Sequence, residues 1–203
     1  MDAQMYNKIV ETYQARQKKR LLIALAMVIV GALTAVSVVG AVVCIVGVVY
    51  LMIEGIRTVG LYSARKKNIA QLKSTGEFDQ AMLSLSNGLK QGMDGLTYAW
   101  SEDYFLTGYG AIFNMKQIAW VFPFTHTTSY FFIPIVRQHW CKALLLDGTE
   151  RIVFYGKAKD KAAFETLLRG MLAVNPDLLI GHTPENQKLY SERVQQYKEA
   201  RNA

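Results

Sequence analysis

The chain contains few of the residues from which catalytic and metal sites are built. It has two cysteines and three histidines in 203 residues. The cysteines, Cys44 and Cys141, give no disulfide framework, and no histidine pair has the i, i+4 spacing of a helical metal site. The sequence also shows no phosphate-binding glycine loop and no nucleophile motif. We therefore expect a protein that is not an enzyme and that uses no metal ion or cofactor.

Charge is missing from a long stretch near the N-terminus. The 33 residues from Leu21 to Ile53 contain no charged residue and no proline, and Thr34 and Ser37 are their only small polar side chains. An apolar run of 18 or more residues is typical of a membrane helix, because a helix satisfies its own backbone where lipid offers no partner. A core helix rarely exceeds about 25 residues without interruption, and a signal peptide has an apolar region of about 7–15 residues. The stretch therefore predicts insertion into the cell membrane.

A basic surplus is missing from the C-terminal part of the chain. The net charge is +7. Residues 1–20 carry five basic and two acidic side chains, residues 54–73 carry five and one, and the chain from Ser74 onward carries thirteen of each. A nucleic-acid binder needs a basic face against the phosphates, so we expect no nucleic-acid partner. The surplus flanks the apolar stretch, where membrane lipids are the expected partners. The candidate headgroup contacts are Lys18, Lys19, Arg20, Arg65, Lys66 and Lys67.

Two arrangements of the apolar stretch are open. As one helix it would be about 50 Å long, against about 30 Å for the hydrocarbon core. Two spans of about 20 residues would need to include flanking residues such as Ile56, or a thinner bilayer. Because Lys and Arg gather on the cytoplasmic side, a hairpin that turns near residues 34–40 places both basic flanks in the cytosol, whereas a single span places one outside. We favour the hairpin, and with either arrangement we expect a cytoplasmic C-terminal domain.

The chain divides into five segments. Residues 1–20 have an apolar stripe of Met5, Ile9 and Tyr13, which predicts an amphipathic helix. This helix either lies in the membrane interface or is a cytosolic extension of the first membrane helix that packs on the soluble domain. Ser74 and Glu77 have the spacing of a capping box, which predicts a helix that begins there and ends at Gly92. The predicted segments are the amphipathic helix at 1–20, the membrane segment at 21–60, basic juxtamembrane and linker helices at 61–95, a sheet domain at 96–180 and a polar C-terminal helix at 181–203.

The sheet domain shows short runs of aromatic and β-branched residues between turn residues, a pattern typical of antiparallel sheets. Asp147-Gly148 is a hairpin turn, and residues 125–129 are expected to form a polar loop. An amphipathic helix should run from Asp160 to Asn175, and Pro184 should open the last helix. The predicted strands are 96–100, 104–107, 111–115, 118–122, 131–136, 140–146 and 150–155.

This order of strands followed by a helix is that of a pleckstrin-homology-like barrel. The segments 104–108 (YFLTG), 118–122 (IAWVF) and 175–181 (NPDLLIG) resemble an uncharacterised family of bacterial membrane proteins. In that family a short N-terminal membrane anchor precedes such a domain. The resemblance covers roughly residues 75–190. It implies an α+β fold tethered to the membrane in the cytosol, and it transfers no catalytic residue.

The aromatic residues of the sheet domain are more numerous than a small barrel core requires, and an exposed remainder would mark a partner surface. We therefore expect a membrane-anchored cytosolic interaction module that docks a protein partner or self-associates into a homo-oligomer. A peripheral sensor of anionic lipid is the alternative, although the neutral charge of the domain argues against it. A small enzyme is the third possibility and has the least support. The candidate partner surface consists of Trp120, Phe122, Phe124, His126, Tyr130 and Phe131.

Overall fold

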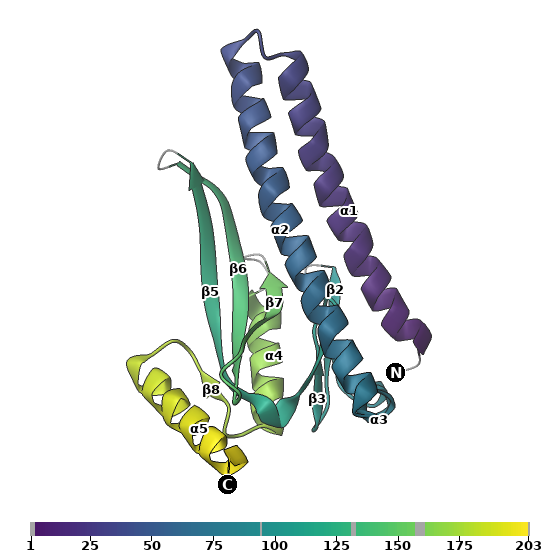
Figure 1. Ribbon diagram of the computed structural model, residues 1–203, viewed down its shortest axis with the longest axis vertical. Coiled ribbons are helices and arrows are strands. Elements are labelled where there is room, and N and C mark those ends of the chain that lie inside the picture. The colour runs from purple at the N-terminus through teal and green to yellow at the C-terminus, as the bar shows by residue number, and fades with distance from the viewer. Residues whose placement is uncertain (1–2, 94, 131–132, 157–160, 203) are drawn as a thin grey trace.

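A computed structural model describes residues 3–93, 95–130, 133–156 and 161–202 of the chain. The fold is α+β and has a long helical hairpin at its N-terminal end (Figure 1). Helices α1 (Ala3–Leu33) and α2 (Val38–Ser74) lie side by side, and their joined ends stand clear of the other elements. Residues 1–20 take the second of the two predicted placements: α1 continues through Arg20 into the apolar stretch without a break, and Ile9 packs against the first sheet.

The turn between α1 and α2 falls within the predicted region of residues 34–40. The Thr34 hydroxyl donates to the carbonyl oxygen of Val30 at 2.7 Å, and the Ser37 hydroxyl donates to that of Thr34 at 2.9 Å. Ser37 Oγ also accepts the backbone N–H of Gly40 at 3.0 Å, so that Ser37 is the N-cap of α2. Helix capping by one serine therefore sets this turn, which lacks proline, asparagine and charged residues.

The segment after α2 differs from the prediction. Helix α3 (Glu77–Ser86) ends early, and Leu89–Met93 form strand β1 instead of its last turn. Ser74 is the last residue of α2, and the N-cap of α3 is Gly76 at φ +74°, without a side-chain cap. A Cβ atom at Gly88 would lie 2.4 Å from the Trp100 carbonyl oxygen, so glycine allows the chain to turn there and pair with β2.

The strands form two four-stranded sheets. The first sheet has the order β1-β2-β3-β4, and the second has the order β7-β6-β5-β8. Within the described ranges no closed barrel forms, because the short 3-10 helix η1 (Met115–Gln117) separates the two sheets. The predicted α+β fold with antiparallel sheets is therefore confirmed, whereas a closed barrel is not seen in the described residues. The remaining strands are β2 (Leu96–Trp100), β3 (Tyr104–Leu106), β4 (Ile112–Asn114), β5 (Ile118–Tyr130), β6 (Ile133–Leu145), β7 (Glu150–Gly156) and β8 (Leu179–Ile180).

The second sheet contains the longest strands, and they correct the predicted loop at residues 125–129. These residues belong to β5, where Thr125 lies opposite His139 and Thr127 opposite Arg137. Threonine favours extended backbone, and ladder hydrogen bonds do not require apolar side chains. Pro134 lies in β6 next to a register shift, where a missing N–H is tolerated. The β5–β6 pair extends in the direction of the hairpin tip (Figure 1).

Two apolar clusters cover the two faces of the first sheet. Tyr98 and Trp100 belong to a core shared with the second sheet and with Leu167 of helix α4 (Lys161–Val174). The intervening Ala99 belongs to the other cluster, which contains Ile9 of α1 and residues of α2 and α3. This alternation follows from the two-residue period of a strand. The last helix, α5 (Pro184–Asn202), begins at Pro184 as predicted and contacts β5 and β8. The predicted N-cap Asp160 lies outside the described residues.

Candidate functional site at the base of the helical hairpin

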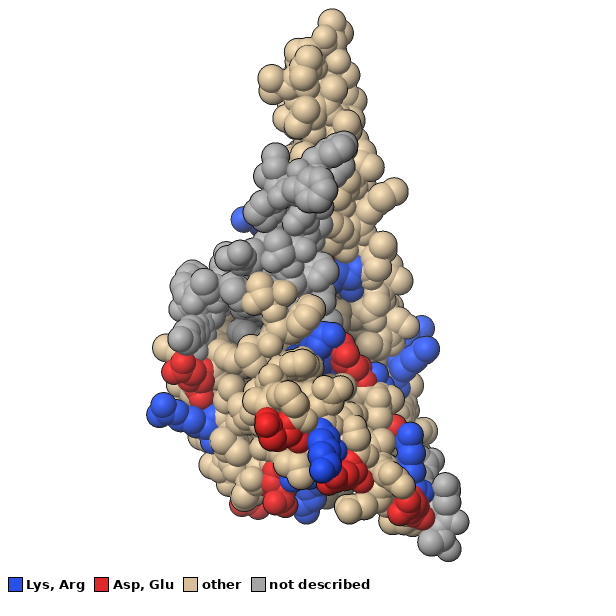
Figure 2. Space-filling view, turned by 90° about the vertical axis from the view of Figure 1, so that its left-hand side faces the viewer, with Lys and Arg blue, Asp and Glu red and all other residues tan. Residues whose placement is uncertain are grey.

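The hairpin has two chemically different parts. We call residues 21–33 of α1 and 38–53 of α2 the apolar section, and residues 3–20 and 54–74 the base. Large aliphatic side chains of the apolar section are exposed, among them Leu33, Val38 and Ile45. By length and composition, α2 is suited to crossing a membrane. On the face shown in Figure 2, acidic and basic side chains gather around the lower part of the molecule, and the joined helix ends carry none.

Helix contact in the apolar section depends on small residues. A Cβ atom at Gly31 would lie 2.3 Å from the backbone nitrogen of Cys44, and one at Gly47 would lie 2.8 Å from that of Val28. Such distances are shorter than any van der Waals contact, so the two backbones approach as closely as they do only because glycine is present. Close approach of this kind is typical of helices that pack in lipid, where apolar burial does not drive association.

A buried carboxylate marks the boundary between the apolar section and the base. The side chain of Glu54 is 1% exposed, and its Oε1 atom lies 3.3 Å from Arg57 Nη1 and 3.6 Å from Arg20 Nη1. One turn further, the Thr58 hydroxyl donates to the buried Gln17 side chain at 3.2 Å. A buried charge is costly unless it is paired, so these contacts fix the alignment of α1 against α2. Sequence reasoning did not single out Glu54, although it is the only acidic residue between 54 and 73.

The alignment separates the predicted headgroup contacts into two levels. Arg20 lies opposite Glu54 and Arg57, directly below the apolar section. Lys66 is nine residues beyond Arg57 in the same helix, about 14 Å further at about 1.5 Å per residue. Lys18 and Lys19 are exposed beside Arg20, whereas Arg65–Lys67 lie beside the sheet domain. The two basic clusters flank the apolar stretch in sequence but lie at different distances from it in space.

A pocket of about 260 Å³ lies between the helices of the base, immediately below the apolar section. Its walls include the buried side chains of Tyr13, Leu61 and Tyr109. Lys18 from one predicted headgroup cluster and Arg65 from the other both line it. The fold thus brings together two basic residues that the sequence places 47 positions apart.

The turn Gly108-Tyr109-Gly110 of the sheet domain contributes Tyr109 to the lining of this pocket. Gly110 has φ +88°, and a Cβ atom there would lie 2.7 Å from Val10 Cγ2 and 3.3 Å from Arg65 Cδ. The Tyr6 hydroxyl donates to the Gly110 carbonyl oxygen at 2.8 Å. Burial raises the pKa of the Tyr6 phenol above its ordinary value, with the Arg65 guanidinium acting in the opposite direction, so the phenol stays a donor at neutral pH. The turn is therefore held firmly between α1 and α2.

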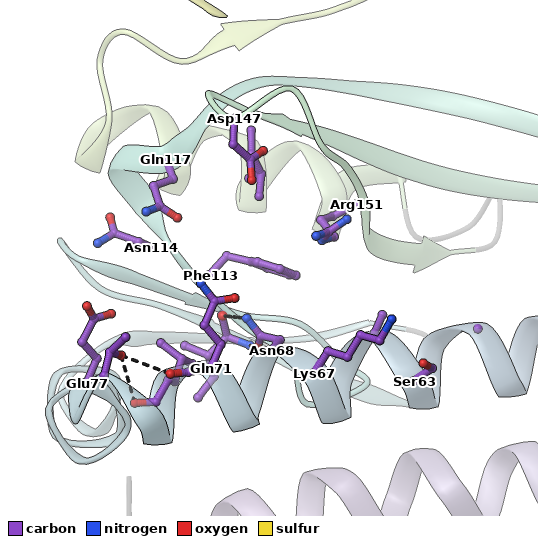
Figure 3. Close-up of a pocket in the computed structure, with 16 residues that line it drawn as sticks. Ser63, Lys67, Asn68, Gln71, Glu77, Phe113, Asn114, Gln117, Asp147 and Arg151 are labelled. Carbon is purple, nitrogen blue, oxygen red and sulfur yellow. Dashed lines mark hydrogen bonds between the residues drawn. The ribbon is translucent and has the colours of Figure 1, made fainter. Parts of the chain in front are cut away.

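A larger cleft of about 500 Å³ lies on the other side of α2, between that helix and the two sheets (Figure 3). Lys67 and Arg151 line one part of it, and Glu77 lies toward the opposite end. Asn68 joins α2 to β4 at this cleft. Its side chain donates to the Ile112 carbonyl oxygen and accepts the Ile112 N–H, both at 2.8 Å. The mixed donors, acceptors and charges of the lining suit a polar protein segment better than an acyl chain.

The candidate partner surface is partly covered. Trp120 and Phe122 are 3% and 7% exposed. The Trp120 ring stacks on His182 with centroids 5.6 Å apart, and its Nε1 donates to the Gly181 carbonyl oxygen at 2.7 Å. Tyr190 of α5 lies against the same ring, at 5.6 Å between centroids. These two residues therefore offer no open surface, because the segment around β8 and α5 covers them.

The other members of that predicted surface do not form one patch with them. Phe124 is 37% exposed, and Lys142 Nζ lies 4.6 Å from its ring centroid, a cation–π distance. His126 and Tyr130 lie further along β5, opposite Gln138 and Ile133. Phe131 lies outside the described residues.

No protein-family model, no curated protein sequence and no solved structure matched this chain. Among the residues that the structure describes, no group of three or more His, Cys, Asp or Glu side chains is placed to hold a metal ion.

Proposed function

We propose that this protein is a membrane-anchored interaction module of the cytoplasmic membrane surface. The apolar section of the hairpin inserts into the lipid, and the α+β domain docks a protein partner or a second copy of the chain. The proposal includes membership of the pleckstrin-homology-like membrane family, which is supported by the order of antiparallel strands followed by an amphipathic helix.

The exposed apolar section is the observation that carries this proposal. Thirteen large apolar side chains between Leu22 and Met52 are exposed. At about 1 kcal/mol for each partly buried side chain, transfer into hydrocarbon would contribute roughly 13 kcal/mol. This is comparable with the whole net stability of a domain, about 5–15 kcal/mol. Lipid is the environment that can cover such a surface on all sides of a helix pair.

The orientation of the hairpin is supported by its charge. Lys18, Lys19 and Arg20 lie at one end of the apolar section, and no charged residue lies at the turn near Ser37. Lys and Arg favour the cytoplasmic side, so both chain termini and the sheet domain face the cytosol in this proposal. The polar cleft beside α2 is the proposed docking site, because it offers charged side chains of both signs on the domain.

Membrane insertion is tested by fractionation and by labelling from the two sides. In a Cys44→Ser background, Ser37→Cys and Asn202→Cys are treated with a charged maleimide, first in intact cells and then in opened membranes. We expect the protein in the membrane fraction and the residue 202 position labelled only after opening. A protein that is extracted with alkaline carbonate, or a tail labelled in intact cells, would contradict the anchoring or its orientation.

Docking is tested with a photo-crosslinking amino acid in native membranes. Gln117 lines the cleft, next to β4. Lys90 is exposed on β1, the edge strand of the first sheet on the side opposite β4. We expect the cleft position to give a discrete protein adduct and the β1 position to give none. An adduct of twice the chain mass identifies self-association, and an adduct of another mass identifies a partner protein. Capture of lipid alone would exclude the docking function and leave the anionic-lipid sensor as the better proposal.

A further inference from the structure

We propose that the pocket at the hairpin base binds one anionic phospholipid, with its phosphate between Lys18 and Arg65 and an acyl chain along Leu21 toward the apolar section. This site rests on the proposed membrane anchoring and gives the anchor a specific ligand. The pocket is formed by α1, α2 and the Gly108–Gly110 turn, so three segments distant in sequence build it.

Charge complementarity identifies the headgroup as an anion. Of the described residues that line the pocket, two are basic and none is acidic. Arg65 is positioned by its neighbours: its guanidinium carbon lies 5.2 Å from the centroid of the Tyr62 ring, and its Cδ is close to Gly110. Lys18 is exposed at the other helix, and a flexible ammonium there can close on a phosphate from the opposite side.

The apolar walls and the location favour a lipid over a free phosphate ion. Tyr13, Leu61 and Tyr109 form walls that a small soluble anion would leave uncovered. Leu21 is both a lining residue and the first residue of the apolar stretch, so the pocket opens directly onto the surface that we place in lipid. A phospholipid presents a charged phosphate and an apolar chain at this spacing. Tyrosines are also enriched at the membrane interface.

Lipid binding here would tie the anchor to the domain. Tyr109 belongs to the sheet domain, and its ring lies 6.1 Å from that of Tyr13 on α1. A lipid in the pocket contacts both, so it adds contacts between hairpin and domain. Because a ligand that binds only the folded arrangement stabilises it by mass action, the bound lipid should raise the unfolding temperature of the purified full-length protein.

The test uses two charge-matched double variants of the full chain. Lys18→Glu/Arg65→Glu changes the two pocket residues. Lys8→Glu/Lys73→Glu changes two other exposed lysines, which do not line the pocket, by the same net charge on the same two helices. Each protein is purified in mild detergent, exchanged into mixed micelles that contain phosphatidylglycerol or phosphatidylcholine, and measured by native mass spectrometry.

We expect the wild type to retain one phosphatidylglycerol and to prefer it to phosphatidylcholine. The pocket variant should lose at least about tenfold in occupancy, because two basic contacts to one phosphate are removed, and the control variant should keep it. The charge-retaining pair Lys18→Arg/Arg65→Lys should bind phosphatidylglycerol as the wild type does. A loss of binding in this pair would contradict the site even if the glutamate pair misfolds.

Three results would contradict the site. The first is an equal loss of bound phosphatidylglycerol in both double variants, and the second is equal retention of the two lipids by the wild type. The third is displacement of bound phosphatidylglycerol by millimolar inorganic phosphate. A wild type found outside the membrane fraction would instead contradict the proposed anchoring itself, so the two failures are distinguishable.

Discussion

In the apolar section α1 and α2 meet through glycine, whereas in the base the same two helices meet through charged and amide side chains. Gly31 faces the backbone of Cys44. Three to four turns lower, Arg20 faces Glu54 and Gln17 faces Thr58. The base also packs on the first sheet through Ile9 and Leu72, while the apolar section projects beyond the other elements (Figure 1).

If the apolar section lies in lipid, as we propose, the two parts of the helix pair have different surroundings. In water, apolar side chains drive packing, and the base buries them against the sheet. In lipid, aliphatic side chains gain nothing by meeting each other, so association depends on close backbone contact. The buried charges lie where the two regimes meet and resist sliding of one helix along the other. Each region should therefore respond to a different kind of substitution.

The largest effect is expected at the boundary. Glu54→Gln removes the buried carboxylate that faces Arg20 and Arg57, so both ion pairs of Glu54 are lost. Breaking a buried ion pair in this way costs about 3–5 kcal/mol. We expect a clear drop in unfolding temperature in detergent, measured by circular dichroism. Glu11→Gln, on the exposed face of α1, is the control and should change little; equal behaviour of the two variants would show that the cluster does not hold the hairpin.

A smaller effect is expected in the apolar section. Gly31→Ala places a methyl group 2.3 Å from the Cys44 nitrogen, so the helices must separate. Overpacking of this kind costs about 1–3 kcal/mol. Gly55→Ala is the matched control, since a Cβ atom there meets nothing within 4 Å, and the better helix propensity of alanine should stabilise it by about 1 kcal/mol. The free energy of unfolding in detergent should therefore fall for Gly31→Ala and rise for Gly55→Ala. An equally large fall for Gly55→Ala would contradict the close contact at Gly31.

Much of the fold was predictable because its determinants are local. Pro184 opens α5, and the strand at residues 96–100 has the predicted bounds. The helical turn near Ser37 was also placed correctly, although its serine cap was not recognised. In these places a few neighbouring residues decide the backbone conformation, and their pattern is visible without the rest of the chain.

The parts that were missed depend on contacts between distant residues. Strand β1 continues the helical spacing of Phe78, Met82 and Leu85, and only its pairing with β2 shows that Leu89 is extended. Strand β8 has two residues and exists through parallel pairing with β5. Lys18, Arg65 and Lys67 were all among the predicted headgroup contacts. The sequence did not show that Lys18 and Arg65 line one pocket and Lys67 a different cleft, because this depends on how α1 and α2 are aligned.

The attachment of the base to the first sheet provides a third prediction. Asn68→Ala removes both hydrogen bonds to the backbone of Ile112. At about 1 kcal/mol for each bond, we expect a loss of about 1–2 kcal/mol in the free energy of unfolding. We also expect faster amide hydrogen exchange in β4, as measured by mass spectrometry. Lys67→Ala changes the exposed neighbour and should stay within about 0.5 kcal/mol of wild type. Unchanged exchange at β4 in the Asn68 variant would mean that other contacts hold helix and sheet together.

The smallest effect is expected in the core of the second sheet, where the reactivity of Cys141 should not change when lipid is present or absent. Cys141 is buried, and burial raises the pKa of its thiol far above the ordinary value. Since the thiolate is the reactive form, folded Cys44→Ser protein should not react with maleimide at neutral or mildly alkaline pH, in vesicles or in detergent. A reporter at Lys90→Cys, on the exposed edge strand, should react readily under the same conditions. Labelling of Cys141 that rises when lipid is removed would show that packing of the sheet domain depends on the membrane, and the division between the two regions would then be less sharp than the helix contacts indicate.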